Sequence, residues 1–454
     1  MSSSISLEKH PEDRLARLLP GESALFRYQL TQWYLPEKPQ IDFLVVAVAD
    51  DRDRDVIKIL LTSEVSEAEA ILRDKIISLE TMLELAALCR VPVIDLSQVQ
   101  KLEPVSIAKP WGREIWFTGM EQRGLSQLGD GVYSVPLAWL IGLMPQTMMG
   151  DSAQSPNLLK ILDPLPEPVF GDLYFELHEQ KREVYVVTHV DRQAWPAGVG
   201  GIRYGFSSDQ RQRFKDDEDF RSAYLAAVNA YRAIRRTIDD LIDELRTRDG
   251  LDLSEPVSSM QAKKWLEEIP AEVLEEEVAL RGAMERFTDI RTLCQGDIVE
   301  VPLLMPHALQ HGVRTVEFQT PVYERKILSF GQKVLTQQEW DTTEAVAMMS
   351  LEASENTGRG MVEETPAIMR EQVVSFEDFE VQRVSLKNEE PWQVPKSDTY
   401  VLIMAVSGQV DIDDQSLGPE QAVFVPASCK PVCRRAVGAE TGVILVLLPK
   451  SAAL

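Results

Sequence analysis

The stretch YFELHEQKREVYVV, residues 174–187, decides the fold that we expect. Apolar and polar side chains alternate on both sides of a short polar segment, which is typical of two β-strands joined by a hairpin. Residues two apart on a strand point to the same face, so Glu176 and His178 are predicted to project together into a barrel lumen. A short hairpin would bring Glu183 alongside them on the next strand.

A later stretch, residues 296–308, reads GDIVEVPLLMPHA and supplies one more imidazole, that of His307. Two imidazoles and the carboxylates of Glu176 and Glu183 form a suitable ligand set for a divalent cation. Zinc accepts nitrogen and oxygen ligands and keeps an open position at catalytic sites. Manganese or ferrous iron would accept the same set. The sequence therefore predicts a metal site built from Glu176, His178, Glu183 and His307.

The other three histidines of the chain, His10, His189 and His311, fit no motif position. We interpret them as ordinary hydrogen-bonded residues. A three-histidine metal centre would require His189 or His311 to move in, so glutamates must complete the predicted site.

The sequence around these motifs predicts an antiparallel β architecture interrupted by helices. Short apolar runs are separated by Gly, Pro and Asp between residues 105 and 206, and again after residue 291. Between them, Val228, Tyr231 and Ile238 recur at helical spacing. Near the N-terminus, strands are expected at 41–49, 56–62 and 91–96, with a helix at about 66–89. The resulting domains are an N-terminal α/β unit (1–104), a metal-binding β domain (105–206 and 291–349), a helical insertion (207–290), a linker (350–372) and a C-terminal β domain (373–454).

Composition limits the classes of function. The chain has 454 residues, a length that favours two to four domains. Its formal net charge of −25 argues against binding nucleic acid or an anionic membrane. Four scattered cysteines do not form a disulfide framework. The N-terminus lacks a signal-peptide pattern, and the longest apolar stretch, 132–144, contains Pro136 and is too short to span a bilayer. We expect a cytoplasmic protein.

The order E-x-H-x4-E, followed later by G-D-x4-P-x4-H, resembles the two halves of the cupin metal motif, with Glu176 where the first histidine usually stands. More specifically, the chain resembles the type I mannose-6-phosphate isomerases, which are zinc-dependent cupins. The segments that carry this resemblance are Lys109-Pro-Trp111-Gly112, Glu176-x-His178, Lys181-x-Glu183, Cys294-Gln-Gly296-Asp297 through Pro306-His307-Ala308, and Glu317-Phe-Gln319 with Tyr323-Glu-Arg325. The resemblance covers residues 105–454, including the helical insertion and a second, smaller β barrel.

The resemblance implies cupin barrels of the double-stranded β-helix or jelly-roll type and a zinc cofactor, with Mn²⁺ or Fe²⁺ as alternatives. It implies that Glu176, His178, Glu183 and His307 bind the metal. Lys181 and Arg325 would face a sugar phosphate, and Glu317 would lie nearby. The implied reaction interconverts mannose 6-phosphate and fructose 6-phosphate through an enediol, with either Lys181 or Glu317 as the base.

The sequence also departs from the family pattern. Glu176 replaces a glutamine ligand, and this should tighten metal binding and lower Lewis acidity. Only four residues separate His178 from Glu183, where the family has a long loop. Tyr174 replaces a serine that helps to hold the phosphate, and Pro321 and Val322 stand where the family has a Ser-Asp pair.

These departures leave an alternative, a non-catalytic cupin that binds a sugar, a nucleotide-sugar or a protein partner. A different metallo-cupin reaction, such as an oxygenation, is a third possibility, against which the matches at Lys181 and Arg325 count. In a chain of charge −25, the metal, Lys181 and Arg325 would have to create a local positive pocket for a phosphorylated substrate.

Overall fold

The stretch at 174–187 forms two strands, β14 (Phe175–Leu177) and β15 (Glu183–Val190), but they belong to different sheets. β14 pairs with β19 (His307–Leu309) and β21 (Lys326–Ser329), whereas β15 pairs with β18 (Ile298–Val301) and β20 (Val313–Gln319). The predicted hairpin is therefore wrong. Residues 178–182 cross from one sheet to the other. This crossing allows side chains of both sheets to pack in one core.

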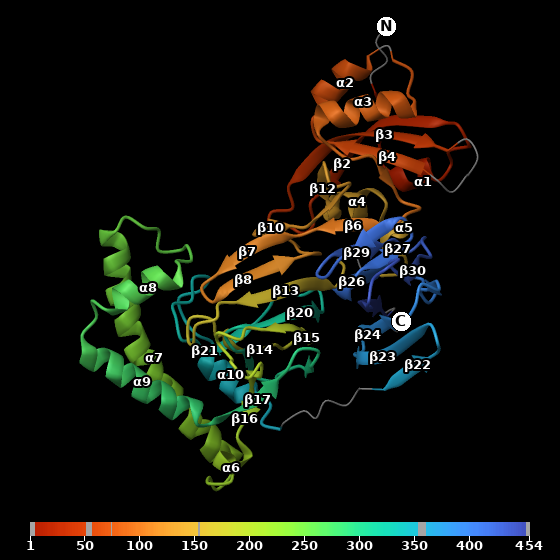
Figure 1. Cartoon of the computed structure of the whole chain (residues 1–454). Coiled ribbons are helices and arrows are strands. Elements are labelled where there is room, and N and C mark those ends of the chain that lie inside the picture. The colour runs from red at the N-terminus through yellow and green to blue at the C-terminus, as the bar shows by residue number, and fades with distance from the viewer. Residues whose placement is uncertain (1–4, 51–56, 74, 153–154, 353–359, 451–454) are drawn as a thin grey trace. The chain divides into compact units, whose positions relative to one another are not determined.

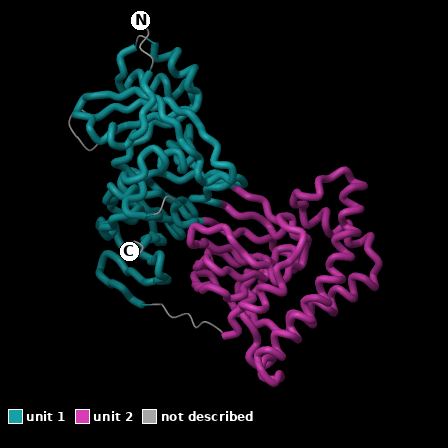
Figure 2. Tube along the Cα trace, turned by 180° about the vertical axis from the view of Figure 1, so that it is seen from behind, with its two compact units in different colours: residues 1–105, 116–159, 358–454 teal, residues 106–115, 160–357 magenta. Residues whose placement is uncertain are grey.

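The structure is a computed structural model that describes residues 5–50, 57–73, 75–152, 155–352 and 360–450. The chain divides into two compact units, shown in Figure 2. Unit 1 contains residues 1–105, 116–159 and 358–454, and unit 2 contains residues 106–115 and 160–357.

Unit 2 is built on two sheets, visible in Figure 1. The six-stranded sheet has the order β18, β15, β20, β13 (Leu158–Pro164), β8 (Gly112–Trp116) and β7 (Val105–Lys109). The five-stranded sheet has the order β17 (Thr288–Leu293), β16 (Gly200–Phe206), β19, β14 and β21. Side chains of both sheets, among them Tyr185, Tyr204, Val301 and Ile327, form one buried cluster. The two sheets thus enclose a common core, as in a jelly roll.

The helical insertion follows β16 and consists of α6 (Ser208–Arg211), α7 (Asp217–Arg248), α8 (Ser259–Leu266) and α9 (Ala271–Glu285). Asp216 caps α7 by accepting a hydrogen bond from the Asp219 N–H, at 3.0 Å. Phe220, Tyr224 and Val228 recur along one face of α7 and are fully buried. They pack in one cluster with Phe175 and Leu177 of β14, together with residues of α10 (Thr342–Met348).

The two faces of β14 consequently have different neighbours. Phe175 and Leu177 face the helices, whereas Tyr174, Glu176 and His178 alternate with them and point to the opposite side of the sheet. Burial of the apolar face, at about 1.5–3 kcal/mol for a side chain of this size, fixes the register of β14. A shift by one residue would turn the polar side chains toward α7.

Unit 1 contains a five-stranded sheet in sequence order, β1 (Leu7–Glu8), β2 (Ser23–Thr31), β3 (Gln40–Ala49), β4 (Ile57–Thr62) and β5 (Ile94–Asp95). Its helices are α1 (Pro11–Leu15), α2 (Val65–Leu72) and α3 (Leu79–Cys89). The helix expected at 66–89 is therefore two helices. A new N-terminus begins at Ser78, which exchanges capping hydrogen bonds with Thr81. Val56, the first residue of the strand expected at 56–62, lies outside the described residues.

The rest of unit 1 is a second β-rich block. Its nine-stranded sheet has the order β12 (Ser134–Pro136), β11 (Gln127–Gly129), β6 (Gln100–Glu103), β29 (Ala422–Val425), β26 (Val401–Gly408), β31 (Gly442–Pro449), β24 (Phe379–Leu386), β23 (Ile368–Ser375) and β22 (Met361–Glu364). A four-stranded sheet has the order β25 (Trp392–Gln393), β30 (Val432–Arg435), β27 (Val410–Ile412) and β28 (Gln415–Leu417). The remaining short elements are β9 (Met120–Glu121), β10 (Gly124–Leu125), α4 (Leu137–Leu143) and α5 (Pro145–Met149).

The compact units divide the chain at other points than the sequence patterns suggest. Residues 116–159 group with the two ends of the chain, because β6 pairs with β29 and brings β11 and β12 into the sheet of the C-terminal strands. Of the expected linker 350–372, residues 353–359 lie outside the described residues, while β22 and the start of β23 occupy its C-terminal part. Their polar side chains suit a sheet edge as well as a linker.

The class predicted from the sequence, mainly β with a helical insertion, is confirmed. Within the described ranges, no helix is both long enough and apolar enough to cross a membrane.

Candidate metal centre

Three side chains from adjacent strands meet on the inner side of the five-stranded sheet. Glu176 of β14 is the register partner of His307 of β19, and His178 follows two residues after Glu176. Their ligand atoms, one carboxylate oxygen and two ring nitrogens, all lie within 4.8 Å of one another. The two imidazole centroids are 5.2 Å apart. A single divalent cation can be reached by all three groups at this spacing.

Main-chain carbonyls orient both imidazoles. The Nδ1 atom of His178 lies 3.0 Å from the carbonyl oxygen of Glu324, and Nδ1 of His307 lies 3.0 Å from that of Met305. A carbonyl accepts only, so each Nδ1 carries a proton, and loss of the proton from Nε2 would present that atom's lone pair to a cation. Metal-binding histidines are commonly held in this way.

One atom directed into the centre has no hydrogen-bond partner. Nε2 of His178 is buried and has none among the described residues. Burying an unpaired polar atom is costly, and a cation would remove that cost by accepting the lone pair of the neutral ring. The donor set of nitrogen and oxygen atoms therefore fits the zinc ion that the sequence predicts.

Glu183, the fourth predicted ligand, comes from the opposite sheet and faces both imidazoles. Its Oε1 lies 3.4 Å from Nε2 of His178, and its Oε2 lies 3.2 Å from Nε2 of His307. The same carboxylate also accepts a hydrogen bond from the Tyr185 hydroxyl at 2.6 Å. Glu183 lies beside the three-residue cluster but is not one of the three mutually close ligands. A cation bound by Glu183 would have to share that carboxylate with the two imidazoles and with the Tyr185 hydroxyl.

Lys181 is buried next to Glu183, with its Nζ 2.7 Å from Oε1 of that carboxylate. Burial alone would raise the pKa of Glu183, but the charges of Lys181 and the adjacent imidazoles outweigh it and hold that pKa well below its usual range. For His178, burial and Lys181 act to lower the pKa, whereas Glu183 and Glu324 outweigh them and raise it. The centre is thus a tightly coupled group of charges.

Arg325 lies on the other side of Glu176. Its Nη1 is 3.8 Å from Oε2 of Glu176, and its Nη2 donates to Oγ1 of Thr336 at 2.6 Å. The guanidinium also lies over the ring of Tyr174, 4.3 Å from the centroid, in a cation–π arrangement. Burial raises the pKa of the Tyr174 hydroxyl to about 12, so this phenol is neutral. Tyr174, which replaces the serine of the resembled family, is therefore part of the wall next to Arg325.

Glu317 lies opposite Tyr185 in the pairing of β15 with β20 and is 1% exposed. Its Oε2 is 3.2 Å from Nζ of Lys160, while Oε1 has no hydrogen-bond partner among the described residues. Burial, and then the nearby charge of Glu183, raise the pKa of Glu317 well above its usual range. The structure therefore brings Glu317 to the back of the centre rather than to the imidazoles.

Sequence reasoning missed a buried ion-pair chain behind Glu317. Lys160 also approaches Glu114, whose other oxygen lies 3.2 Å from Nζ of Lys109. All three of these side chains are largely buried. A signal was present, because Lys160 is a single charge in the apolar run NLLKIL and Lys109 belongs to the Lys-Pro-Trp-Gly segment. Neither feature predicts a partner without the sheet order.

The three remaining histidines lie outside the cluster. Nδ1 of His311 donates to Oδ1 of Asp172 at 2.7 Å, and the ring stacks on Trp195, with centroids 4.7 Å apart. His189 is exposed on β15, and His10 is exposed before α1. None of them belongs to the described metal-binding group.

Comparison with known proteins places this fold. No model of a protein family matches the chain, and no curated protein matches it. Solved structures do match. The mannose 6-phosphate isomerase from Bacillus subtilis is 13% identical, with a TM-score of 0.52 over 77% of this chain and 99% of its own.

Two further matches are similar in extent. A variant of the phosphomannose isomerase from Salmonella typhimurium is 14% identical, with a TM-score of 0.54 over 78% of this chain and 100% of its own. A zinc-bound mannose 6-phosphate isomerase is 13% identical, with a TM-score of 0.53 over the same shares. The chain thus has the cupin fold of the mannose-6-phosphate isomerases, and the predicted resemblance is confirmed at the level of the fold. Identities this low carry no more than the fold.

Proposed function

We propose that this protein is a metal-dependent aldose–ketose isomerase that interconverts mannose 6-phosphate and fructose 6-phosphate, or a related sugar-phosphate pair, through an enediol. One observation carries the proposal. In a barrel of the isomerase fold, Glu176, His178 and His307 converge, and both imidazoles are held through Nδ1 with Nε2 directed inward.

The residues would divide the work as follows. Glu176, His178, His307 and Glu183 would hold the cation, which when bound polarises the oxygens of the sugar carbonyl and hydroxyl. Isomerisation requires a proton to leave C2 of the aldose and to be delivered to C1, with the hydroxyl proton moving between the two oxygens. Lys181, whose Nζ lies 2.7 Å from Glu183, and Glu317, which lies beside the same carboxylate, are the two candidates for carrying the carbon-bound proton.

Arg325 would provide positive charge on the substrate side. Its guanidinium is held in place by the hydrogen bond to Thr336 and by the contact with the ring of Tyr174. It can therefore face developing negative charge without reorganisation. In an acidic protein, a fixed cation of this kind offsets the unfavourable field that a sugar phosphate meets.

A second candidate, a non-catalytic sugar-binding cupin with a structural metal, is favoured by one specific feature. Tyr174 occupies the position of a phosphate-holding serine in the resembled family and stacks on Arg325. This contact occupies one face of the guanidinium that the isomerase proposal assigns to substrate.

Two measurements on the purified protein separate these functions. Metal content is determined by elemental analysis, and turnover of mannose 6-phosphate is followed by a coupled assay for fructose 6-phosphate. The isomerase proposal expects near-stoichiometric zinc and turnover that disappears on chelation. Bound metal without turnover would support the sugar-binding candidate, and a protein unable to bind metal would contradict both.

A further inference from the structure

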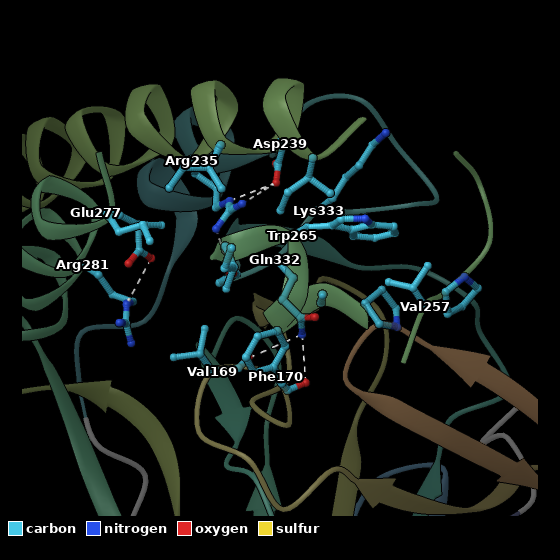
Figure 3. A pocket seen from close by; sticks show the side chains of 18 of the residues that line it. Val169, Phe170, Arg235, Asp239, Val257, Trp265, Glu277, Arg281, Gln332 and Lys333 are labelled. Atoms are coloured by element: carbon cyan, nitrogen blue, oxygen red, sulfur yellow. Dashed lines mark hydrogen bonds and ion pairs between the residues drawn. The ribbon is translucent and has the colours of Figure 1, made fainter. Parts of the chain in front are cut away.

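The helical insertion of unit 2 encloses a cavity of about 290 Å³ that includes none of the proposed metal ligands. Figure 3 shows it between the helices and the loops around Phe170 and Gln332. One face of each helix lines it, with Ile238 and Ile242 from α7, Trp265 from α8 and Leu274 from α9. Ile238 and Ile242 are four residues apart and therefore lie on one face of α7, so the cavity is bordered by that face together with α8 and α9.

The wall of the cavity is mostly apolar. Trp265 is fully buried, and its indole N–H is already satisfied by Asp249 at 2.8 Å. Ile238 is also fully buried, and Phe170 contributes an aromatic ring from the loop. Protein interiors rarely leave a void of this size among large side chains, whereas pockets for small molecules are of about 300–1,000 Å³ and have this composition. The body of a ligand that fits here must therefore be apolar.

The charged groups around the cavity favour an anion. Four of the lining side chains are basic and two are acidic, in a protein whose net charge is −25. Most of the basic groups have a carboxylate partner. Arg235 lies 2.9 Å from Asp239, and Arg281 lies 3.2 Å from Glu277. Lys333 pairs with Asp243 at 2.5 Å.

Arg246 differs from these three. Its guanidinium donates to the main-chain carbonyls of Asp252 and Glu255, which orient the group but carry no net charge. The side chain is 3% exposed, and its Nε has no hydrogen-bond partner among the described residues. A buried guanidinium with a donor left over is a site for one planar anion.

We propose that this cavity binds a small apolar monocarboxylate, with its chain or ring among Trp265, Ile238 and Leu274 and its carboxylate at Arg246. A single carboxylate matches Arg246, the one guanidinium among the described lining residues that forms no ion pair with a side-chain carboxylate. A phosphate would bring further charge, and Asp239 and Glu277 would oppose it. The volume excludes a polypeptide segment.

The probe is octanoate, titrated calorimetrically into the full-length protein, with 1-octanol and octylammonium as comparison ligands of similar length. We expect saturable binding of one octanoate per chain, at least about tenfold tighter than either comparison ligand, equivalent to about 1.4 kcal/mol. Equal binding of 1-octanol, tighter binding of octylammonium or the absence of saturable octanoate binding would overturn the proposal.

Variants locate the site. Arg246→Gln should weaken octanoate binding at least tenfold, whereas Arg248→Gln should not change it, because Arg248 on the same helix pairs with Glu268 and is not part of the lining. If Arg246→Gln does not fold, Ala262→Trp tests the same site by filling the cavity from α8, and it should abolish binding. Octanoate binding that survives Ala262→Trp in a folded protein, or that falls equally in Arg248→Gln, would place the ligand elsewhere.

Discussion

At residue 176, a carboxylate stands where the resembled family has an amide. It adds a negative charge within reach of two imidazoles, and Arg325 lies 3.8 Å from its second oxygen. Because of this charge, the site should bind a cation more tightly. The bound cation should then withdraw less electron density from the substrate oxygens. The expected result is firmer retention of a bound metal together with lower Lewis acidity.

The substitution Glu176→Gln tests this expectation. We expect zinc affinity to fall by about tenfold, or about 1.4 kcal/mol, while turnover per bound zinc rises. Competition with a chromogenic chelator measures the affinity. Glu179→Gln is the matched control, since Glu179 lies on the following loop and pairs with Lys326 instead. Unchanged affinity in Glu176→Gln would show that this side chain does not bind the metal.

The substitution Arg325→Ala should strongly reduce turnover without loss of zinc. The guanidinium touches Glu176, Thr336 and Tyr174 but is not a metal-binding group, so its removal should lower kcat/KM by about 10²–10³-fold while the metal content stays constant. The control is Lys326→Ala, the adjacent cation, which pairs with Glu179 and Glu344. Unchanged turnover in Arg325→Ala would rule out the proposed role.

Alternation along one strand was enough to predict that Glu176 and His178 share a face, because the two-residue period of a strand is a local property. The position of Glu183 across the barrel was not local. The predicted hairpin placed it beside β14, whereas sheet pairing places it opposite. Lys160 escaped prediction for the same reason, since its partners Glu114 and Glu317 lie on other strands.

At the scale of elements, one carboxylate connects three neighbouring strands of unit 2. Asp163 of β13 accepts a hydrogen bond from Nε of Arg113 on β8 at 2.7 Å and forms an ion pair with Arg314 on β20. Burial acts to raise the pKa of Asp163, but the two guanidinium groups outweigh it and lower that pKa. The ionised carboxylate therefore holds β8, β13 and β20 together.

This arrangement predicts a pH dependence. Because the pKa of Asp163 is lower in the folded state, its contribution is present above the unfolded-state pKa, about 3.9, and is lost as pH falls through the folded-state pKa. Asp163→Asn should lower the free energy of unfolding by about 1–2 kcal/mol at pH 7, and the difference from wild type should shrink below about pH 4. Urea unfolding at several pH values measures this difference.

The control is Asp289→Asn, on an exposed edge of β17. It should leave the free energy of unfolding nearly unchanged at both pH values. A difference for Asp163→Asn that stays constant down to pH 3 would contradict an effect of charge and would indicate a packing defect.

At the scale of the whole molecule, periodicity predicted the class of the fold but not how distant segments combine. The apolar runs of β26, β29 and β31 can be recognised in the sequence, and so can the helical insertion, whereas the start of β23 falls in the segment expected to be a linker. The pairing of Lys101 with Val423 is not, because nothing within either strand specifies a partner more than three hundred positions away. The pattern of residues within a segment therefore predicts individual helices and strands. The division of the chain into two units depends on the order of strands in the sheets, which such patterns do not specify.

That division predicts how metal acts on stability. All four proposed ligands, Glu176, His178, Glu183 and His307, belong to unit 2, so zinc should stabilise that unit alone. At zinc a hundredfold above Kd, linkage gives about 2.7 kcal/mol. For a unit of about two hundred residues, this should raise Tm by about 5–10 °C. Calorimetry of the full chain should then show two transitions, of which zinc moves one.

Matched histidine variants decide whether the shift comes from the proposed centre. His178→Ala should lose the zinc-induced shift, because it removes a ligand whose Nε2 points into the cluster. His311→Ala should keep it, although His311 is also a buried imidazole of unit 2, since its ring contacts Asp172 and Trp195 instead. A shift of both transitions, or one that persists in His178→Ala, would mean that zinc binds elsewhere, because the stabilisation would then not depend on an imidazole of the proposed centre.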